Sequence, residues 1–119
     1  MKIISLNRNG QFQRLYRKGA SFVAPTMVVY TAKNRLEVCR LGITAGKKVG
    51  GAVERNRAKR RIRELFRDAL PELKPGYDFC IVARTCTVEA PAAKVRRDFY
   101  ASLKKLGVLS DETTADSVD

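Results

Sequence analysis

Residues 52–70 combine an apolar and a basic pattern, and this combination constrains the fold of the chain more than any other feature. At about 100° per residue around a helix axis, the apolar residues of the segment fall within one arc. They are Ala58, Ile62, Leu65, Phe66 and Ala69. The opposite arc holds Asn56, Arg60, Arg63 and Arg67, with Arg57 and Arg61 on one flank and Lys59 on the other. We expect one amphipathic helix, ended by Pro71, that packs on a sheet and presents guanidinium groups to solvent.

Basic residues are most concentrated around this predicted helix. The 119-residue chain carries 24 Lys and Arg against 12 Asp and Glu, a formal net charge of +12. Residues 47–67 contain nine of the basic residues and only two acidic ones. The basic residues are Lys47, Lys48, Arg55, Arg57, Lys59, Arg60, Arg61, Arg63 and Arg67. Because acids do not alternate with them, the block favours nucleic acid as the partner, and a solvated helix face is the alternative.

Length and composition indicate one globular domain. A chain with 45% hydrophobic residues can bury one modest core, which we expect within residues 1–110. Residues 111–119 contain four acids and no base, so we expect an acidic, disordered tail there. No apolar run approaches the roughly 18 residues of a membrane span, and the first residues lack a secretory signal. We therefore expect a cytoplasmic protein without a membrane partner.

The residue types present exclude several classes of enzyme. The chain has no histidine, which rules out a Ser-His-Asp triad, a Cys-His pair and a histidine metal ligand. The three cysteines are an odd number without Cys-x-x-Cys spacing, so neither a disulfide framework nor a zinc site is expected. Cys39 and Cys80 lie within apolar runs and are interpreted as small buried hydrophobic residues.

Periodicity predicts three helices and four strands in the order α-β-β-β-α-β-α. Helices are expected at 8–18, at 52–70 and from Pro91 to near Gly107, and strands at 20–24, 27–32, 38–45 and 77–84. Asn7 or Asn9 is expected to cap the first helix and Gly19 to end it. The order indicates an α+β fold, an α/β sandwich in which the helices pack on a mixed four-stranded sheet.

The segment from Lys47 to Glu64 resembles the signature of the bacterial ribonuclease P protein subunit. The matching residues are Lys47-Lys48-Val49-Gly50, Ala52-Val53, Arg55-Asn56-Arg57, Lys59-Arg60 and Ile62-Arg63-Glu64, with Arg55-Asn56-Arg57 as the core of the signature. Other segments resemble the family too, namely Arg40-Leu41-Gly42-Ile43, the spaced Phe12, Tyr16 and Gly19, Tyr30, and Gly76-Tyr77-Asp78 before an apolar strand. The resemblance covers about residues 6–107 and rests on a long ordered pattern.

The resemblance implies a function and a division of labour. Proteins of this family bind a large catalytic RNA, and the complex is an endoribonuclease that removes the 5′ leader of precursor tRNA. The RNA carries the active site and its Mg²⁺ ions, and one protein per RNA is expected, so no catalytic residue is expected in this chain. The family's fold also implies a left-handed crossover in the strand–helix–strand unit, against the usual right-handed preference.

The resemblance further implies which residues contact RNA. The catalytic RNA is expected to contact Lys47, Lys48, Arg55, Asn56, Arg57, Lys59, Arg60, Arg61, Arg63 and Arg67. The leader is expected to contact Phe12, Tyr16, Tyr30, Arg14, Arg17 and Lys18. The aromatic rings would stack on unpaired bases, although the four-residue spacing of Phe12 and Tyr16 alone favours ordinary core packing. For the three basic residues, a solvated surface is the alternative.

Two other functions are alternatives to this one. A ribosomal or general RNA-binding protein would share the charge and the fold class, but not the detailed pattern of the signature. A nuclease that acts without RNA is disfavoured, because the sequence lacks histidine and clustered carboxylates with which to activate water or hold two metal ions.

Overall fold

The computed structural model describes residues 3–6 and 8–110. The expected tail at 111–119 and the candidate cap Asn7 lie outside these residues. The helices are α1 Asn9–Lys18, α2 Ala52–Ala69, the short α3 Cys86–Glu89 and α4 Ala92–Leu106. The strands are β1 Ile4–Ser5, β2 Ala20–Val23, β3 Met27–Lys33, β4 Arg40–Thr44 and β5 Tyr77–Ala83. Two 3₁₀ turns, Lys47–Val49 and Leu70–Glu72, precede and follow α2.

The strands form one mixed sheet in the order β1-β4-β5-β3-β2. β4 and β5 are parallel, with Arg40 opposite Asp78, and α2 connects them. β3 runs antiparallel to both β5 and β2, and β1 pairs in parallel with β4. The predicted α+β sandwich is confirmed, but the sheet has five strands instead of four. β1 has two residues, too few for the alternation by which a strand is recognised in a sequence.

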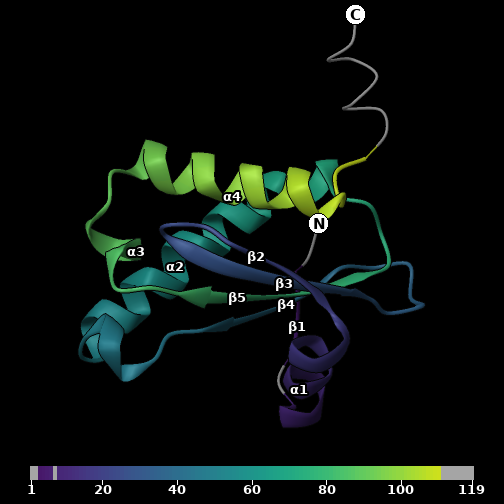
Figure 1. Ribbon diagram of the computed structural model, residues 1–119, viewed down its shortest axis with the longest axis horizontal. Coiled ribbons are helices and arrows are strands. Elements are labelled where there is room, and N and C mark those ends of the chain that lie inside the picture. Colours follow the sequence, from purple (N-terminus) through teal and green to yellow (C-terminus); the bar gives the residue numbers. More distant parts are fainter. Residues whose placement is uncertain (1–2, 7, 111–119) are drawn as a thin grey trace, which may run out of the picture.

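α2 and α4 lie on one face of the sheet and bury the main core there (Figure 1). The whole predicted apolar arc of α2 is buried, and the Phe66 ring meets Phe79 of β5 edge-on with centroids 5.3 Å apart. α4 contributes the fully buried side chains of Val95, Phe99 and Leu103. The helix that carries the basic row is thereby held on the sheet by its apolar side.

α1 covers part of the opposite face of the sheet (Figure 1). Leu15 packs there with Leu6 and the buried Cys80, and Phe12 lies over Gly42 of β4. A Cβ atom at Gly42 would come within 2.4 Å of the Phe12 ring, so the glycine is what lets this ring approach the sheet. The aromatic residues of α1 and the arginines of α2 therefore lie on opposite faces of one sheet.

The start of α1 differs from the expected cap. The helix begins at Asn9 with Arg8 as its N-cap, and the Gln11 side chain accepts a hydrogen bond from the Arg8 N–H at 3.1 Å. Asn9 is therefore inside the helix, whereas Gly19 ends it as predicted by donating its N–H to the Leu15 carbonyl. The other predicted helices and strands end within two residues of their expected bounds.

The cysteines are free, and two of them are buried as predicted. Cys39 and Cys80 lie among apolar side chains on opposite sides of the sheet. Cys86 opens α3, a short helix that the sequence did not indicate, and its thiol donates to the Pro25 carbonyl at 2.9 Å. This bond ties α3 to the turn between β2 and β3.

Candidate nucleic-acid interface

The outward arc of α2 presents a row of polar and basic groups to solvent. Its exposed members are Asn56, Arg57, Arg60, Arg63 and Arg67, and its half-buried ones are Arg55 and Lys59. These side chains have no hydrogen bond or ion pair to any other residue that the structure describes. Because the buried arc holds the helix in place, the guanidinium forks are left to bind phosphate oxygens in pairs.

Arg61 differs from its neighbours because its guanidinium group is engaged within the protein. Nη1 of Arg61 donates to the carbonyl oxygens of Thr87, Val88 and Ala90 at 2.9, 3.1 and 2.7 Å. These carbonyls lie at the C-terminal end of α3, where a cation is favourable. Arg61, expected from the resemblance to bind RNA, thus also fastens α3 to α2. Nothing in the sequence indicates this contact, since its acceptors lie in an element that periodicity does not predict.

Hollows flank the basic row of α2 on both sides. Lys59 and Arg63 line one of about 140 Å³ beside β1 and β4. Arg57, Arg60 and Arg61 line another of about 330 Å³ beside α3, together with Glu64 and Val88. In each hollow two or more cations lie close enough to share one phosphate group, although the second also contains an acid.

The loop before α2 opens onto a cavity of about 520 Å³ at the carboxyl ends of β4 and β5. Residues 46–49 line one wall and residues 82–85 the other, so Arg84 lines the same cavity as Lys47 and Lys48. Arg84 is an addition to the predicted site. Because the carboxyl ends of parallel strands meet at one edge of a sheet, its place directly after β5 is the signal that could have identified it.

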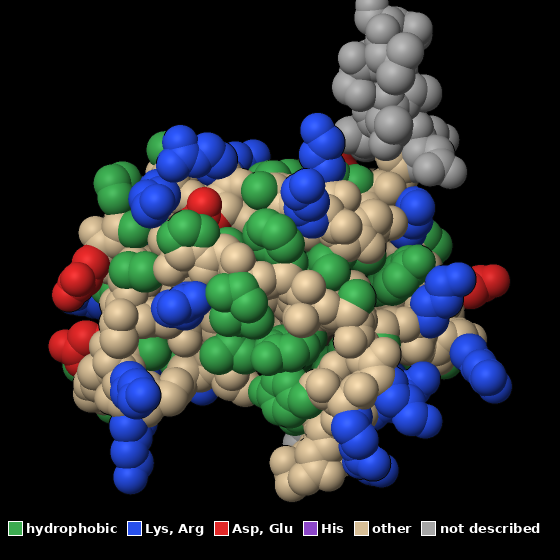
Figure 2. Space-filling model, in the orientation of Figure 1, with side chains coloured by type: hydrophobic (Ala, Val, Ile, Leu, Met, Phe, Trp, Pro, Cys, Tyr) green, Lys and Arg blue, Asp and Glu red, His purple; other side chains and the backbone are tan. Residues whose placement is uncertain are grey.

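Phe12, Tyr16 and Tyr30 gather on the face of the sheet that α1 covers. The Tyr16 and Tyr30 rings meet edge-to-face, with centroids 4.9 Å apart and planes at 77°. The Tyr16 hydroxyl lies 3.5 Å from the buried Cys80 Sγ, so its polar end points at the sheet. Tyr16 nevertheless keeps 44% of its surface exposed. Figure 2 shows apolar side chains gathered where α1 meets the strands, a surface that suits stacked bases.

The contact between Tyr16 and the sheet predicts a pH effect. Burial, and then the hydrogen bond to Cys80, raises the pKa of Tyr16 from 10.0 to about 12. The contribution of this group to stability is complete below pH 10 and falls as the pH rises toward 12, because the unfolded chain ionises first. We expect the phenolate absorbance of the folded protein to include a tyrosine that titrates near 12. Tyr16→Phe removes that step, and an unchanged titration in Tyr16→Phe would contradict the assignment.

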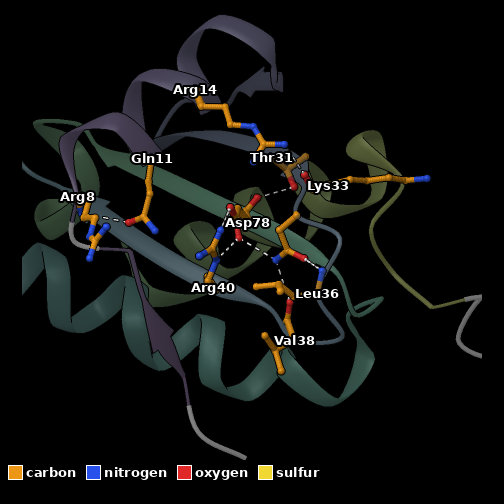
Figure 3. A network of polar contacts seen from close by, with 10 residues as sticks. Arg8, Gln11, Arg14, Thr31, Lys33, Leu36, Val38, Arg40 and Asp78 are labelled. Atoms are coloured by element: carbon orange, nitrogen blue, oxygen red, sulfur yellow. Dashed lines mark hydrogen bonds and ion pairs between the residues drawn. The ribbon is translucent and has the colours of Figure 1, made fainter.

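The basic residues of α1 divide into one anchored and two free side chains. Arg14 Nη2 donates to the Lys33 carbonyl at the end of β3, at 3.3 Å (Figure 3). Arg17 and Lys18 are exposed in the last turn of α1, and neither forms a hydrogen bond or ion pair with another described residue. Of the three basic residues expected at the leader, these two are thus the ones whose side-chain donors have no partner among the described residues.

A network of polar contacts fixes the loop between β3 and β4 (Figure 3). Arg40 donates through Nε and Nη2 to the two carboxylate oxygens of Asp78, each at 2.7 Å, and this bond raises the pKa of Arg40. Asn34 Nδ2 donates to Asp78 at 2.8 Å and to the Val38 carbonyl at 3.0 Å. The Leu36 N–H donates back to Asn34 Oδ1 at 2.7 Å. Asp78 therefore links two strands and the loop between β3 and β4.

Metal-binding clusters and membrane helices are not found in the described part of the chain. Across residues 3–6 and 8–110, no three His, Cys, Asp or Glu side chains are grouped so that they could hold a metal ion. No helix within those ranges is long and apolar enough to cross a membrane. The described site consists instead of cations, aromatic rings and backbone donors, groups that bind nucleic acid.

Known proteins resemble this chain over most of its length. The sequence profile of the ribonuclease P family matches residues 1–107. The ribonuclease P protein component of Natranaerobius thermophilus is 38% identical over 108 residues, which are 91% of this chain and 94% of that protein. The component from Clostridium botulinum is 38% identical over 109 residues, 91% of this chain and 98% of its own.

Solved structures also resemble the fold of this chain. The ribonuclease P protein of Staphylococcus aureus matches with a TM-score of 0.82 at 34% identity, covering 92% of this chain and 100% of that one. The protein of Thermotoga maritima matches with a TM-score of 0.72 at 28% identity, covering 85% and 94%. This chain therefore belongs to the ribonuclease P protein family, whose members act with a catalytic RNA as the endoribonuclease that removes the 5′ leader of precursor tRNA.

Proposed function

We propose that this chain performs the role of its family through two surfaces on opposite faces of the sheet. The basic row of α2, with Lys47 and Lys48 before it, binds the catalytic RNA. The aromatic residues of α1 and β3 hold the single-stranded leader of precursor tRNA. The observation that carries this proposal is the separation of the two surfaces, since the arginines of α2 and the partly exposed rings of α1 and β3 lie across one sheet from each other.

The α2 surface suits a structured RNA. Its cations project from a rigid helix, so phosphate oxygens can be held at fixed positions without base-specific contacts. Lys47 and Lys48 lie next to Gly51, the N-cap of α2, where backbone N–H groups also favour an anion. Asn56 adds an amide that can donate to RNA from the centre of the signature. Arg61 shares this surface while holding α3.

The aromatic surface suits an unpaired strand. The contacts of Tyr16 with Cys80 and Tyr30 fix the orientation of its ring, and the exposed part of the ring can stack on a base. Phe12 packs over Gly42 and provides a second ring. Arg17 and Lys18, exposed at the end of α1, can bind the phosphates of the same strand. Arg14 supports this site by fastening α1 to β3.

The chemistry of cleavage is assigned to the RNA. No three metal-binding side chains are grouped among residues 3–6 and 8–110. We propose that the RNA holds the Mg²⁺ ions, as the resemblance to the family implies. The protein's part is to bind and orient the RNA and the substrate in the cytoplasm. We also propose that one protein binds each RNA.

Changing the ring at Phe12 tests the leader site. Phe12→Ala is expected to weaken binding of precursor tRNA to the assembled holoenzyme about tenfold, because one stacked base is worth about 1–3 kcal/mol. Binding of mature tRNA, which has no leader, is expected to stay unchanged. The measurement is the equilibrium dissociation constant of the holoenzyme for each of the two tRNAs, with the holoenzyme in excess over the tRNA.

Two further variants separate stacking from packing at this position. Phe12→Tyr keeps an aromatic face and is expected to bind precursor tRNA as the parent does. Phe12→Leu keeps apolar volume over Gly42 but has no ring, so it is expected to behave like Phe12→Ala. An equal loss for precursor and mature tRNA in all three variants would show that Phe12 acts only in folding.

A further inference from the structure

The outward face of α4 carries a second concentration of basic residues. Around the helix axis, at about 100° per residue, one arc holds Lys94, Arg97, Ala101, Lys104 and Lys105. All of these except Lys94 are exposed, and Figure 2 shows basic side chains over α4. The acid of this helix, Asp98, is buried and accepts hydrogen bonds from the N–H and hydroxyl of Thr26. Asp98 therefore forms no ion pair with the outward cations, although it follows Lys94 by four residues.

The stability of α4 does not explain why its outward face carries these basic residues. Lys104 and Lys105 lie in the last turn, where they complement the helix dipole. Lys94, however, lies in the first turn, which has no acid, and it repels Arg97 three residues later. The four side chains have no ion pair or hydrogen bond to any residue described in the structure. Positive charge that opposes folding and is not neutralised within the described chain indicates an anionic partner.

This face lies on the same side of the sheet as the basic row of α2, but acids separate the two. Arg96 Nη1 is 3.8 Å from Asp68 Oδ2 at the end of α2, and its guanidinium lies over the Tyr100 ring. The Tyr100 hydroxyl donates to Glu72 at 3.3 Å. Asp68 and Glu72 therefore stand between the two cationic surfaces, which makes them distinct patches rather than one.

We propose that the outward face of α4 is a second binding surface for the catalytic RNA and contacts phosphates of a segment that α2 does not reach. The proposal rests on the proposed function of α2, because an RNA docked there continues on the same side of the sheet. The aromatic site lies across the sheet, so the leader is not the occupant. Arg97 and Lys104 are about 10 Å apart along the axis and reach separate phosphates.

The test compares variants with equal changes in net charge. Arg97→Gln with Lys104→Gln removes two cations from α4. The control, Lys33→Gln with Arg35→Gln, removes two exposed cations from the end of β3 and the loop that follows it, and is called the loop variant. Affinity for the catalytic RNA, without substrate, is measured over a range of KCl concentrations at constant Mg²⁺. The α4 variant is expected to bind the RNA about tenfold more weakly, and the slope of its log K against log KCl concentration is expected to be shallower by about one to two. The affinity of the loop variant is expected to change less than about twofold.

A second pair of variants leaves every native cation in place. Ala101→Glu puts a negative charge at the centre of the α4 face, whereas Ala101→Gln is its uncharged counterpart. Only Ala101→Glu is expected to weaken RNA binding, and both are expected to unfold at the temperature of the parent, since residue 101 is exposed. This pair distinguishes a lost contact from a disturbed helix.

The outcomes separate this proposal from the one on which it rests. Equal effects of the α4 and loop variants would overturn the α4 surface. A loss confined to binding of precursor tRNA by preassembled holoenzyme would overturn it as well, since the partner would then be the substrate. If Arg60→Gln with Arg63→Gln leaves the affinity for the catalytic RNA unchanged, the proposed function of α2 is contradicted, and the α4 proposal that rests on it is contradicted too. A loss of affinity in this α2 variant without a loss in the α4 variant contradicts the α4 proposal alone.

Discussion

Replacing Arg60 and Arg63 with alanine is expected to weaken assembly with the catalytic RNA about fiftyfold at moderate salt. Both side chains are exposed on the outward arc of α2, and neither is paired with another described residue. Each phosphate contact that is lost lowers the dependence of log K on log salt by about 0.7–0.9. The double variant should therefore lose affinity and also respond less steeply to KCl.

Filter binding or fluorescence titration against the catalytic RNA at several KCl concentrations measures both effects. The free energy of unfolding should change little, because the two residues lie opposite the buried arc of the helix. Arg61→Ala is an informative comparison: it should destabilise the fold, since the Arg61 guanidinium holds three carbonyls at the end of α3. An unaltered salt dependence in the Arg60 and Arg63 variant would contradict a phosphate-binding role for α2.

Asp78→Ala is expected to lower the free energy of unfolding by about 3–5 kcal/mol. Asp78 is 6% exposed at its side chain and receives hydrogen bonds from Arg40 and Asn34. Its removal leaves the Arg40 guanidinium group, 21% exposed, without its acceptor, and takes from the Asn34 amide one of its two acceptors. Urea denaturation followed by circular dichroism measures the loss.

The exposed ion pair between Arg96 and Asp68 supplies the matched control. Its atoms are 3.8 Å apart and its side chains are 54% and 63% exposed, so Asp68→Ala should cost less than about 1 kcal/mol. Equal destabilisation by Asp78→Ala and Asp68→Ala would show that the Asp78 network does not hold the sheet together. Loss of this network would also free the loop between β3 and β4. Arg14 donates to the carbonyl of Lys33, the residue directly before this loop.

The parts of the fold that follow from local patterns could be predicted from the sequence. The apolar arc of α2 was identified residue by residue, because a helix repeats every 3.6 residues whatever surrounds it. In β5, Phe79, Ile81 and Ala83 occupy alternate positions and are buried together in the main core, the pattern expected of a strand. The residues of the α2 row were found because their type and spacing are visible in the sequence and match the signature of the family.

The parts that depend on distant residues could not be predicted. β1 forms because Ile4 and Ser5 pair with Arg40 and Leu41. A strand of two residues is too short to produce a pattern in the sequence. The anchoring of Arg61 depends on α3, an element of four residues that has no periodicity of its own. Arg84 joins Lys47 and Lys48 because β4 and β5 are parallel neighbours, so its place directly after β5 becomes informative only once the pairing of these strands is known.

The most direct test of the central claim is a reconstitution of the purified chain with the catalytic RNA of ribonuclease P from the same source. Cleavage of precursor tRNA is measured with each component alone and with both together, at limiting Mg²⁺. We predict no cleavage by the protein alone and a faster reaction with both, governed by salt-dependent binding of the protein to the RNA. Cleavage by the protein without RNA, or no affinity between the two at moderate ionic strength, would contradict the claim.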